Sequence, residues 1–442
     1  MAITLVSLLG YFSMAYLLHR SSFAWLLMLF SMLFGLYVYY LKLAGKQITI
    51  QHAFWAGILF RLIFITSIPV LSDDYTRFIW DGQLWVHDIN AFIYLPNELI
   101  QSGETDHIPL FNTLEQQLND LQKSNYTCYP PLNQLLFVLP ALLFKKSILA
   151  QIVFMRVFIL VAETGIYFFG VKILKKMKLP VSNIFIYFLN PLVIIELTGN
   201  LHFEAIMIFF LVWSVYLLMN NRYKSSAVVF ALSASIKLIP LMLLPLFFYR
   251  LKGIKGILYV FISMFVFVLL LIPLLLSNGT GGFIQSLNLY FQTFEFNASI
   301  FYLLREIGFA ARGYDMVSVF GPALAILALL IILLITFSTN TKNENRFMQS
   351  MVFILLVYYF MATTVHPWYI TTILAVSCFT RLKTPLAWSF AIVLSYHAYQ
   401  TPTFEENWMY LFAEYLIVFS FLGYDFYQVH SKREEQKHSG VL

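Results

Sequence analysis

Charged residues are scarce along this chain, and their scarcity limits the possible folds more than any other feature. Asp, Glu, Lys and Arg make up 11% of the 442 residues, whereas hydrophobic residues make up 60%. A soluble chain needs roughly a quarter of its residues charged to keep its surface hydrated. The composition therefore excludes a soluble enzyme, a disordered chain and a coiled coil. It predicts an all-α, polytopic integral membrane protein.

Apolar runs separated by short polar stretches follow one another along most of the sequence. A membrane-spanning helix uses about 20 apolar residues, and several runs are shorter, so some must tilt, merge or pair as half-depth hairpins. The pattern predicts about 12 to 14 transmembrane helices. We expect them to form a single domain over residues 1–442, with the first run, Ile3 to Leu18, retained as a span because no cleavage site follows it.

The positions of Lys and Arg predict the orientation of the chain. Placing 130–144 along the membrane interface, and not across the membrane, brings every basic cluster between apolar runs to one side. Cytoplasmic loops carry such an excess of basic residues, so both termini are expected inside. Two long segments, 72–147 and 278–316, then face outward and should contain interfacial helices. The net charge of +6 belongs to these clusters, and we expect no nucleic-acid partner.

An acidic stretch opens the first outer segment. SDDYTRFIWDGQLW starts at Ser72, and on a helix its Asp74, Arg77 and Asp81 share one face while apolar residues occupy the other. This arrangement predicts an amphipathic helix on the bilayer surface that directs carboxylates toward water or a cleft. The alternative is a solvated face on which Arg77 only pairs with its two acidic neighbours.

Ionisable residues also lie within the apolar runs. Each costs roughly 2.5 kcal/mol or more at mid-depth unless it is paired or faces a cavity. Arg156 and Glu163, two helical turns apart, form a candidate structural pair. Lys237, in SASIKLIP, lies where a helical hairpin turns near the outer face and could meet a lipid phosphate or snorkel to the interface. The full set is Arg61, Arg156, Glu163, Glu196, Lys237 and Glu414.

Further polar side chains lie in two short outer turns and in the second outer segment. GNLHFEA contains His202 and Glu204, and VHPWY contains His366 beside aromatic residues typical of interface anchors. An interfacial helix after LYFQTFEF is expected to present Arg305. Such residues are often simply solvated, but here Glu196 precedes the first turn, so polar groups converge at one end of a helix pair.

No His-x-x-His or Cys-x-x-Cys spacing and no phosphate-binding glycine loop occurs in the sequence. Serine-hydrolase and nucleotide-binding functions therefore have no support. The inner loops are also too short to hold a cytosolic domain that uses nucleotide sugars.

Taken in order, the motifs resemble those of the GT-C class of membrane glycosyltransferases, specifically the bacterial polyprenol-phosphate-mannose-dependent mannosyltransferases. The resemblance runs from about residue 72 to about residue 370, while the first two and last two spans match only in hydrophobicity. The matching segments are SDDYTRFIWDG with INAFIYLP, YPPLNQLLF, NPLVIIELTGNLHFEA, SIKLIPLMLLPLFF, FNASIFYLL and VHPWY.

The resemblance implies a GT-C-like fold and a catalytic carboxylate. In that class an Asp of the first outer loop, followed three residues later by Arg and an aromatic residue, is associated with catalysis. Asp74, Arg77 and Phe78 take these places, so Asp74 is the expected base, and its division of labour with Asp73 stays open. The implied partners are a polyprenyl-phosphate hexose, with mannose the expected sugar, a glycan or lipid acceptor, and membrane lipids of a bacterial inner membrane.

The implied chemistry needs one base. A polyprenyl phosphate already leaves as a stable anion, so a single carboxylate suffices to take the proton of the attacking hydroxyl. One displacement inverts the anomeric carbon. Nearby cations stabilise the departing phosphate, and a divalent ion, Mg or Mn, bridging Asp73 or Asp74 to it is left open. The expected substrate-binding residues are Arg77, Asp81, His202, Glu204, Lys237, Arg305 and His366, with Lys237, Arg305 and His366 as the cations, in that order.

Two other functions stay open at this point. A transporter or flippase of lipid-linked sugars would explain the intramembrane charges equally well, although the sequence lacks an internal repeat and carries a long acidic outer segment. The second open function is a ligase that moves whole glycans from a lipid diphosphate. Such an enzyme would not use a lipid monophosphate that carries a single sugar.

Overall fold

The computed structural model describes residues 2–292, 294–401 and 403–438. Over these residues the chain is helical, and its β structure is limited to two isolated bridges, which confirms the predicted all-α class. Five helices are long and apolar enough to cross a membrane, and a bent pair of segments, 181–188 and 191–199, would be a sixth span. The five are α2 (Phe23–Leu43), α9 (Ile148–Lys176), α15 (Gly253–Leu275), α18 (Val317–Ser338) and α22 (Trp408–His438).

The long helices expose large apolar side chains. Phe261 of α15, Leu334 of α18 and Phe412 of α22 are 64%, 65% and 69% exposed. Monomeric soluble proteins do not expose apolar surface on this scale, whereas hydrocarbon chains solvate it well. The protein is therefore a membrane protein. Shorter apolar helices accompany the five long ones, and the total of 12 to 14 spans stays a prediction.

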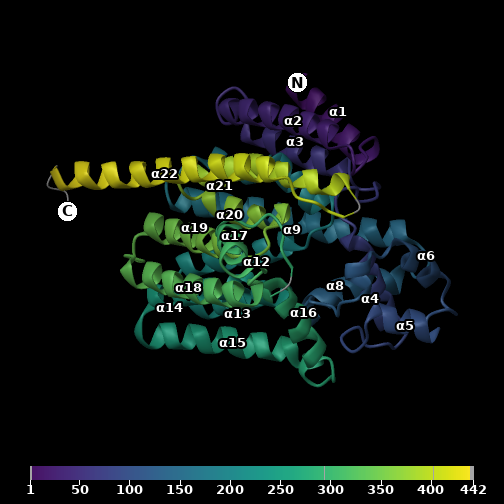
Figure 1. The fold of residues 1–442 in the computed structure, drawn as a ribbon. Helices are drawn as coiled ribbons and strands as arrows, with labels where there is room; N and C mark the ends of the chain where they lie inside the picture. Colours follow the sequence, from purple (N-terminus) through teal and green to yellow (C-terminus); the bar gives the residue numbers. More distant parts are fainter. Residues whose placement is uncertain (1, 293, 402, 439–442) are drawn as a thin grey trace.

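Elements of both outer segments gather at one end of the molecule. In Figure 1, α15, α18 and α22 run in roughly the same direction, and the helices of the first outer segment lie beyond one end of them, with α16 nearby. The elements at this end are α4 (Asp74–Val86), α5 (Pro96–Ser102), α6 (Pro109–Gln117), α7 (Asp120–Lys123), α8 (Pro131–Leu143) and α16 (Thr280–Gln292).

The other helices share one large apolar core with α9, apart from the helix at 300–312, whose Phe301 and Tyr302 belong to a smaller core. They are α1 (Ala2–Tyr16), α3 (Ile50–Leu62), η1 (Val181–Ile184), α10 (Phe185–Phe188), α11 (Pro191–Val193), the π-helix η2 (Ile194–Gly199), α12 (Glu204–Met219), α13 (Tyr223–Ile236), η3 (Ile239–Leu243), α14 (Leu244–Leu251), α17 (Ile300–Arg312), α19 (Glu344–Met361), η4 (Pro367–Tyr369), α20 (Ile370–Ser377), α21 (Thr384–Ala391) and η5 (Ile392–Gln400).

Helix α4 is buried within the protein, so the predicted amphipathic helix on the bilayer surface is wrong. Residues Tyr75 to Leu84 are all buried. Helix α8 packs against α4, and Gly82 permits the close approach, because a Cβ at that position would lie 2.4 Å from the backbone oxygen of Phe137. Protein covers most of the polar face as well as the apolar one, since neighbouring segments bind the side chains of Arg77 and Asp81.

Two buried arginines connect the segments that support this end. Arg61 of α3 donates to both carboxylate oxygens of Glu163, at 2.7 and 2.9 Å, so the predicted pairing of Arg156 with Glu163 is wrong. The reason is geometric: seven residues rise about 10 Å along a helix, whereas Arg61 meets Glu163 side by side from another helix. The hydroxyl of Thr198 also donates to Glu163, at 2.6 Å.

Arg156 bonds to backbone carbonyls. Its guanidinium donates to the oxygens of Thr198 and Gly199 at 2.9 and 2.7 Å, and to those of Ile65 at 3.1 Å and Ser67. The chain after α3 is thereby fastened to the end of η2. We refer to the side chains of Arg61, Arg156, Glu163 and Thr198 together as the clamp.

Candidate functional site

Predicted residues from four distant segments meet near the N-termini of α4 and α12. The ammonium of Lys237 donates to Oε1 of Glu204 at 2.5 Å, and Nε2 of His202 lies 3.4 Å from Oε2 of Glu196. The charge of Lys237 also acts on Asp74, His202 and His366. We refer to Asp73, Asp74, Glu196, His202, Glu204, Lys237 and His366 as the site cluster.

Asp74 is the first residue of α4, and its backbone N–H donates to the hydroxyl of Ser72 at 3.3 Å. Its carboxylate accepts no hydrogen bond from any residue that the structure describes. Burial and the negative charge of Asp73 raise the pKa of Asp74 to about 7, against the opposing effect of Lys237. A carboxylate with a pKa near 7 is partly ionised at neutral pH and is a stronger base than an ordinary carboxylate. It is therefore suited to accept a proton from a hydroxyl.

Asp73 has partners that Asp74 lacks. Its Oδ2 accepts from the guanidinium of Arg20 and from Nδ2 of Asn119, both at 3.2 Å. Arg20 also lies over the ring of Tyr399, 4.2 Å from the centroid. The two adjacent carboxylates therefore differ: Asp73 is held in place, and Asp74 is free. The sequence analysis missed Arg20, whose only signal was its position in an outer loop.

Arg77 and Asp81 form an ion pair inside the protein. Nε of Arg77 donates to Oδ1 of Asp81 at 2.7 Å, and Nη1 donates to the carbonyls of Gln122 and Asn125. Gln134 donates to the second oxygen of Asp81 at 2.9 Å. These bonds attach the later part of the first outer segment to α4. Contact of Arg77 and Asp81 with substrate stays a prediction.

The segment that carries Glu196, His202 and Glu204 is buried within the protein, so these side chains are not solvated, and its place on the outer side of the membrane stays a prediction. These side chains are between 0% and 1% exposed. The chain leaves η2 and passes through Leu201, whose φ of 65° lies in the left-handed region that a bulky residue rarely adopts. Leu201 is itself fully buried, so packing stabilises this unusual conformation. Nothing in the sequence signalled it.

Trp368 is part of this interior and is 7% exposed, so its predicted role as an interface anchor is wrong. Its ring stacks between two imidazoles, with centroid distances of 3.8 Å to His202 and 4.3 Å to His366. Phe296 of the second outer segment stacks on His366 at 5.1 Å. The stack therefore joins segments about 200, 300 and 370 residues along the chain.

Both imidazoles of this stack are neutral at physiological pH. Burial and the charge of Lys237 lower the pKa of His366 to about 3. Burial, Lys237 and His366 lower the pKa of His202 well below its usual range. A neutral imidazole does not supply the positive charge predicted for His366, and contact of His366 with substrate stays a prediction. Lys237 is the cation of the site cluster, and each neutral imidazole can donate one hydrogen bond and accept one.

Arg305 lies in a separate group of side chains in the second outer segment. It donates to Glu295 at 2.6 Å and lies over the rings of Tyr302 and Trp408. The backbone of Phe296, next to Glu295, pairs with that of Thr363 and Val365 just before His366. Arg305 has no contact with the site cluster within the described ranges, so its role toward substrate stays a prediction.

A divalent ion stays a prediction as well. No group of three or more His, Cys, Asp or Glu side chains forms a metal site in residues 2–292, 294–401 and 403–438. Mg²⁺ often uses one or two carboxylates and takes its other ligands from water and substrate phosphate. The free carboxylate of Asp74 beside Asp73 fits that limited donor set.

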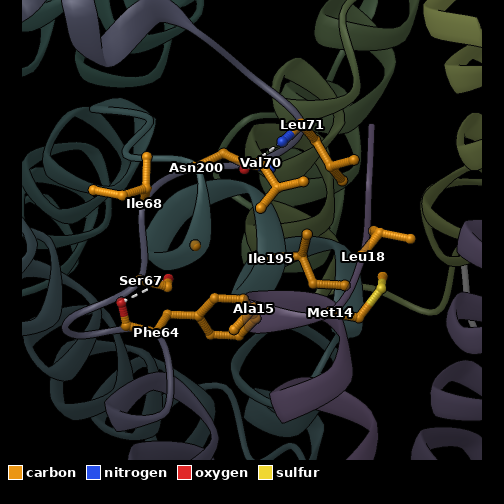
Figure 2. A pocket seen from close by; sticks show the side chains of 11 residues that line it. Met14, Ala15, Leu18, Phe64, Ser67, Ile68, Val70, Leu71, Ile195 and Asn200 are labelled. Atoms are coloured by element: carbon orange, nitrogen blue, oxygen red, sulfur yellow. Dashed lines mark hydrogen bonds between the residues drawn. The ribbon is translucent and has the colours of Figure 1, made fainter. Parts of the chain in front are cut away.

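A small apolar pocket of about 10 Å³, with room for about one water molecule, lies next to the site cluster. Figure 2 shows Ile195, Val70 and Leu71 around it, with Asn200 at one side. Oδ1 of Asn200 accepts from the N–H of Leu71 at 3.2 Å, and its Nδ2 donates to Glu196 at 3.1 Å. Asn200 therefore connects the apolar pocket to the acidic residues of the site.

Comparison with protein families gives one match. The sequence profile described as alpha-(1->6)-mannopyranosyltransferase, N-terminal domain, of the MptA_B family, matches residues 4–251, more than half of the chain. The match includes every residue of the site cluster except His366, and it includes the first two spans, which the motifs alone did not relate to any family. A comparison with curated proteins gives no match.

Proposed function

Because the chain belongs to the alpha-(1->6)-mannopyranosyltransferase family, we propose that this mannosyltransferase takes its mannosyl unit from a polyprenyl-phosphate-linked donor. The acceptor is the 6-hydroxyl of a mannose residue in a glycan or glycolipid. The observation that carries the proposal is the free carboxylate of Asp74, with its pKa of about 7, near the cation Lys237.

Asp74 acts as the general base. It takes the proton of the acceptor hydroxyl while the hydroxyl oxygen forms a bond to the anomeric carbon of mannose. The bond from that carbon to the phosphate oxygen breaks, and its electron pair leaves with the lipid phosphate. A single displacement inverts the configuration, so the α product requires a β-linked donor.

Lys237 stabilises the departing phosphate. Its side chain is 16% exposed, and the rings of Tyr129 and Tyr369 lie within 6 Å of its ammonium, so water only partly screens its charge. A fixed cation acts most strongly in such partly dehydrated surroundings. Bound Mg²⁺ or Mn²⁺ would supply further positive charge near the same phosphate.

The lipid part of the donor accounts for the position of the site. An isoprenoid chain lies between membrane helices and presents its phosphate at the membrane surface, where α4 and α12 begin. With basic loops in the cytoplasm, this surface is the outer face of a bacterial inner membrane.

The contacts of the clamp weaken the argument for a transporter. That alternative depended on the intramembrane charges, but three of them, Arg61, Arg156 and Glu163, bind one another or backbone carbonyls. They hold the helices in place, and nothing in their contacts favours a transport pathway. The residues proposed for glycosyl transfer belong to the site cluster and lie outside the clamp.

The donor assay tests the proposal. Purified protein is incubated with polyprenyl phosphate carrying labelled β-mannose and with a mannose oligosaccharide acceptor. We expect labelled product with a new α-(1→6) bond and release of the lipid phosphate. An intact donor would support a transporter, and transfer only from a lipid diphosphate would support a ligase. Chelation followed by addition of Mg²⁺ or Mn²⁺ tests the metal.

A further inference from the structure

Several buried polar atoms of the site cluster have no hydrogen-bond partner. Among the residues that the structure describes, they are Oε2 of Glu196, both ring nitrogens of His202, Oε2 of Glu204 and Nδ1 of His366. More than nine in ten buried polar groups in proteins are hydrogen-bonded, because an unpaired one loses the hydration it had in the unfolded chain. We refer to Glu196, His202 and Glu204 as the inner polar set.

The three side chains of the inner polar set lie close together. Oε2 of Glu196 and Nε2 of His202 are 3.4 Å apart, and the charges of both Glu204 and Asp74 act on Glu196. The unpaired atoms therefore gather in one place beside the proposed base.

The rest of the protein fixes each of these side chains in place. Oε1 of Glu196 accepts from Nδ2 of Asn200 at 3.1 Å and from the hydroxyl of Tyr396, while Oε1 of Glu204 accepts from Lys237. His202 is held by its stack on Trp368. Each carboxylate thus has one oxygen bound to the protein and the other left as an oriented acceptor.

We propose that the inner polar set binds the hydroxyl groups of the donor's mannosyl ring, an inference that rests on the function proposed above. Two carboxylate oxygens accept from sugar hydroxyls, and the neutral imidazole both accepts and donates. The donor phosphate lies at Lys237, the cation of the site cluster. The ring is that of the donor, because Glu204 of the inner polar set contacts Lys237, which the proposed function assigns to the donor phosphate, whereas the acceptor hydroxyl approaches the partly exposed Asp74.

This role predicts sugar selectivity. Glucose differs from mannose only in the orientation of one ring hydroxyl, and 2-deoxymannose lacks that hydroxyl. A site built to hydrogen-bond a hydroxyl discriminates strongly against an analogue without it, because its own polar atoms are then left unpaired. The inner polar set is therefore expected to determine the preference for mannose.

Glu196→Gln tests the inference with little disturbance to the fold. The amide oxygen can still accept from Asn200 and Tyr396, while the free oxygen becomes an amide donor. Glu414→Gln is the matched control. Glu414 is also fully buried, its Oε1 accepts from Trp388 and Asn297, its Oε2 is unpaired, and it lies outside the site cluster.

The measurement is kcat/KM with short-chain prenyl phosphates of β-mannose, β-glucose and 2-deoxymannose. Glu196→Gln should lower kcat/KM for the mannose donor about tenfold or more and reduce the preference over the analogues by a similar factor. Glu414→Gln should leave the preference unchanged, and both variants should show the thermal unfolding of the wild type.

The inference is overturned if wild type transfers mannose and Glu196→Gln keeps both the rate and the preference. A loss of rate with an unchanged preference also overturns it. If Glu196→Gln does not fold, His202→Gln is measured by the same criteria. If wild type uses none of these donors, the proposed function itself fails, a result distinct from the other two.

Discussion

Two buried groups of charged side chains, the clamp and the site cluster, meet on the short segment from η2 to the start of α12, yet they differ in how completely their hydrogen bonds are made. In the clamp, Glu163 accepts from Arg61 and Thr198, and Arg156 donates to four carbonyls. In the site cluster, and counting only the residues that the structure describes, the inner polar set keeps buried atoms without a hydrogen-bond partner. The charged side chains of the clamp, which have their hydrogen-bond partners, hold the chain together. Those of the site cluster that keep unpaired atoms remain available to bind a ligand.

The two groups also depend on each other. Arg156 holds the carbonyls of Thr198 and Gly199, two and three residues beyond Glu196. The clamp therefore fixes the segment on which the inner polar set is arranged. A change in the clamp should act on folding, and a change in the site cluster should act on transfer, so substitutions can separate the two roles.

The largest effect is expected in the site cluster. Asp74→Asn removes the carboxylate proposed as the base, and general-base catalysis contributes about 10²–10⁴-fold. We expect kcat to fall by that factor with thermal unfolding unchanged. A variant that keeps wild-type transfer would remove Asp74 from the chemistry.

In the clamp, Glu163→Ala should act on stability. It leaves the guanidinium of Arg61 buried without its ion-pair partner, which costs about 3–5 kcal/mol. Denaturant unfolding in detergent measures the loss, and the folded fraction should keep its specific activity. If stability were unchanged while transfer was lost, the clamp and the site cluster would not have separate roles.

Lys237→Met should have a smaller effect on the reaction. Loss of one fixed group that stabilises developing negative charge lowers kcat by about 10²-fold or somewhat more. Because the substitution leaves Glu204 unpaired, the double variant Lys237→Met/Glu204→Gln serves as the control for folding. Transfer by this double variant at the wild-type rate would show that the phosphate is stabilised elsewhere.

The smallest effect is expected from Arg20→Gln. Arg20 is partly exposed, and an ion pair in such surroundings contributes about 1 kcal/mol or less, so transfer should fall less than tenfold. Arg20→Lys should restore most of the loss, because it keeps a cation near Asp73. A loss as large as that of Asp74→Asn would place Arg20 in direct contact with the reacting groups.

The sequence was informative where local spacing decides the outcome. The acidic stretch after the third apolar run, the residues of GNLHFEA and the isolated Lys237 were all identified, and the structure brings Asp74, Glu204 and Lys237 together. These residues stand out because an ionisable group within or beside an apolar run costs free energy unless it is paired or has a function.

Choices among equally possible tertiary partners could not be predicted. Glu163 could pair with either arginine, and only the packing of α3 against α9 selects Arg61. The amphipathic pattern of α4 fits a membrane surface as well as a protein interior, and α8 decides between them. The left-handed conformation of Leu201 and the contact of Arg20 with Asp73 depend on residues far away in the sequence.

The pH dependence of transfer tests the central claim most directly. A base must be ionised to act, so kcat/KM for wild type should rise with pH to a plateau, with its midpoint near the pKa of about 7 for Asp74. Asp73→Asn removes a negative charge that raises this pKa, so its midpoint should move to lower pH. A profile that falls with rising pH, or a midpoint that Asp73→Asn leaves in place, would contradict the assignment of Asp74 as the base.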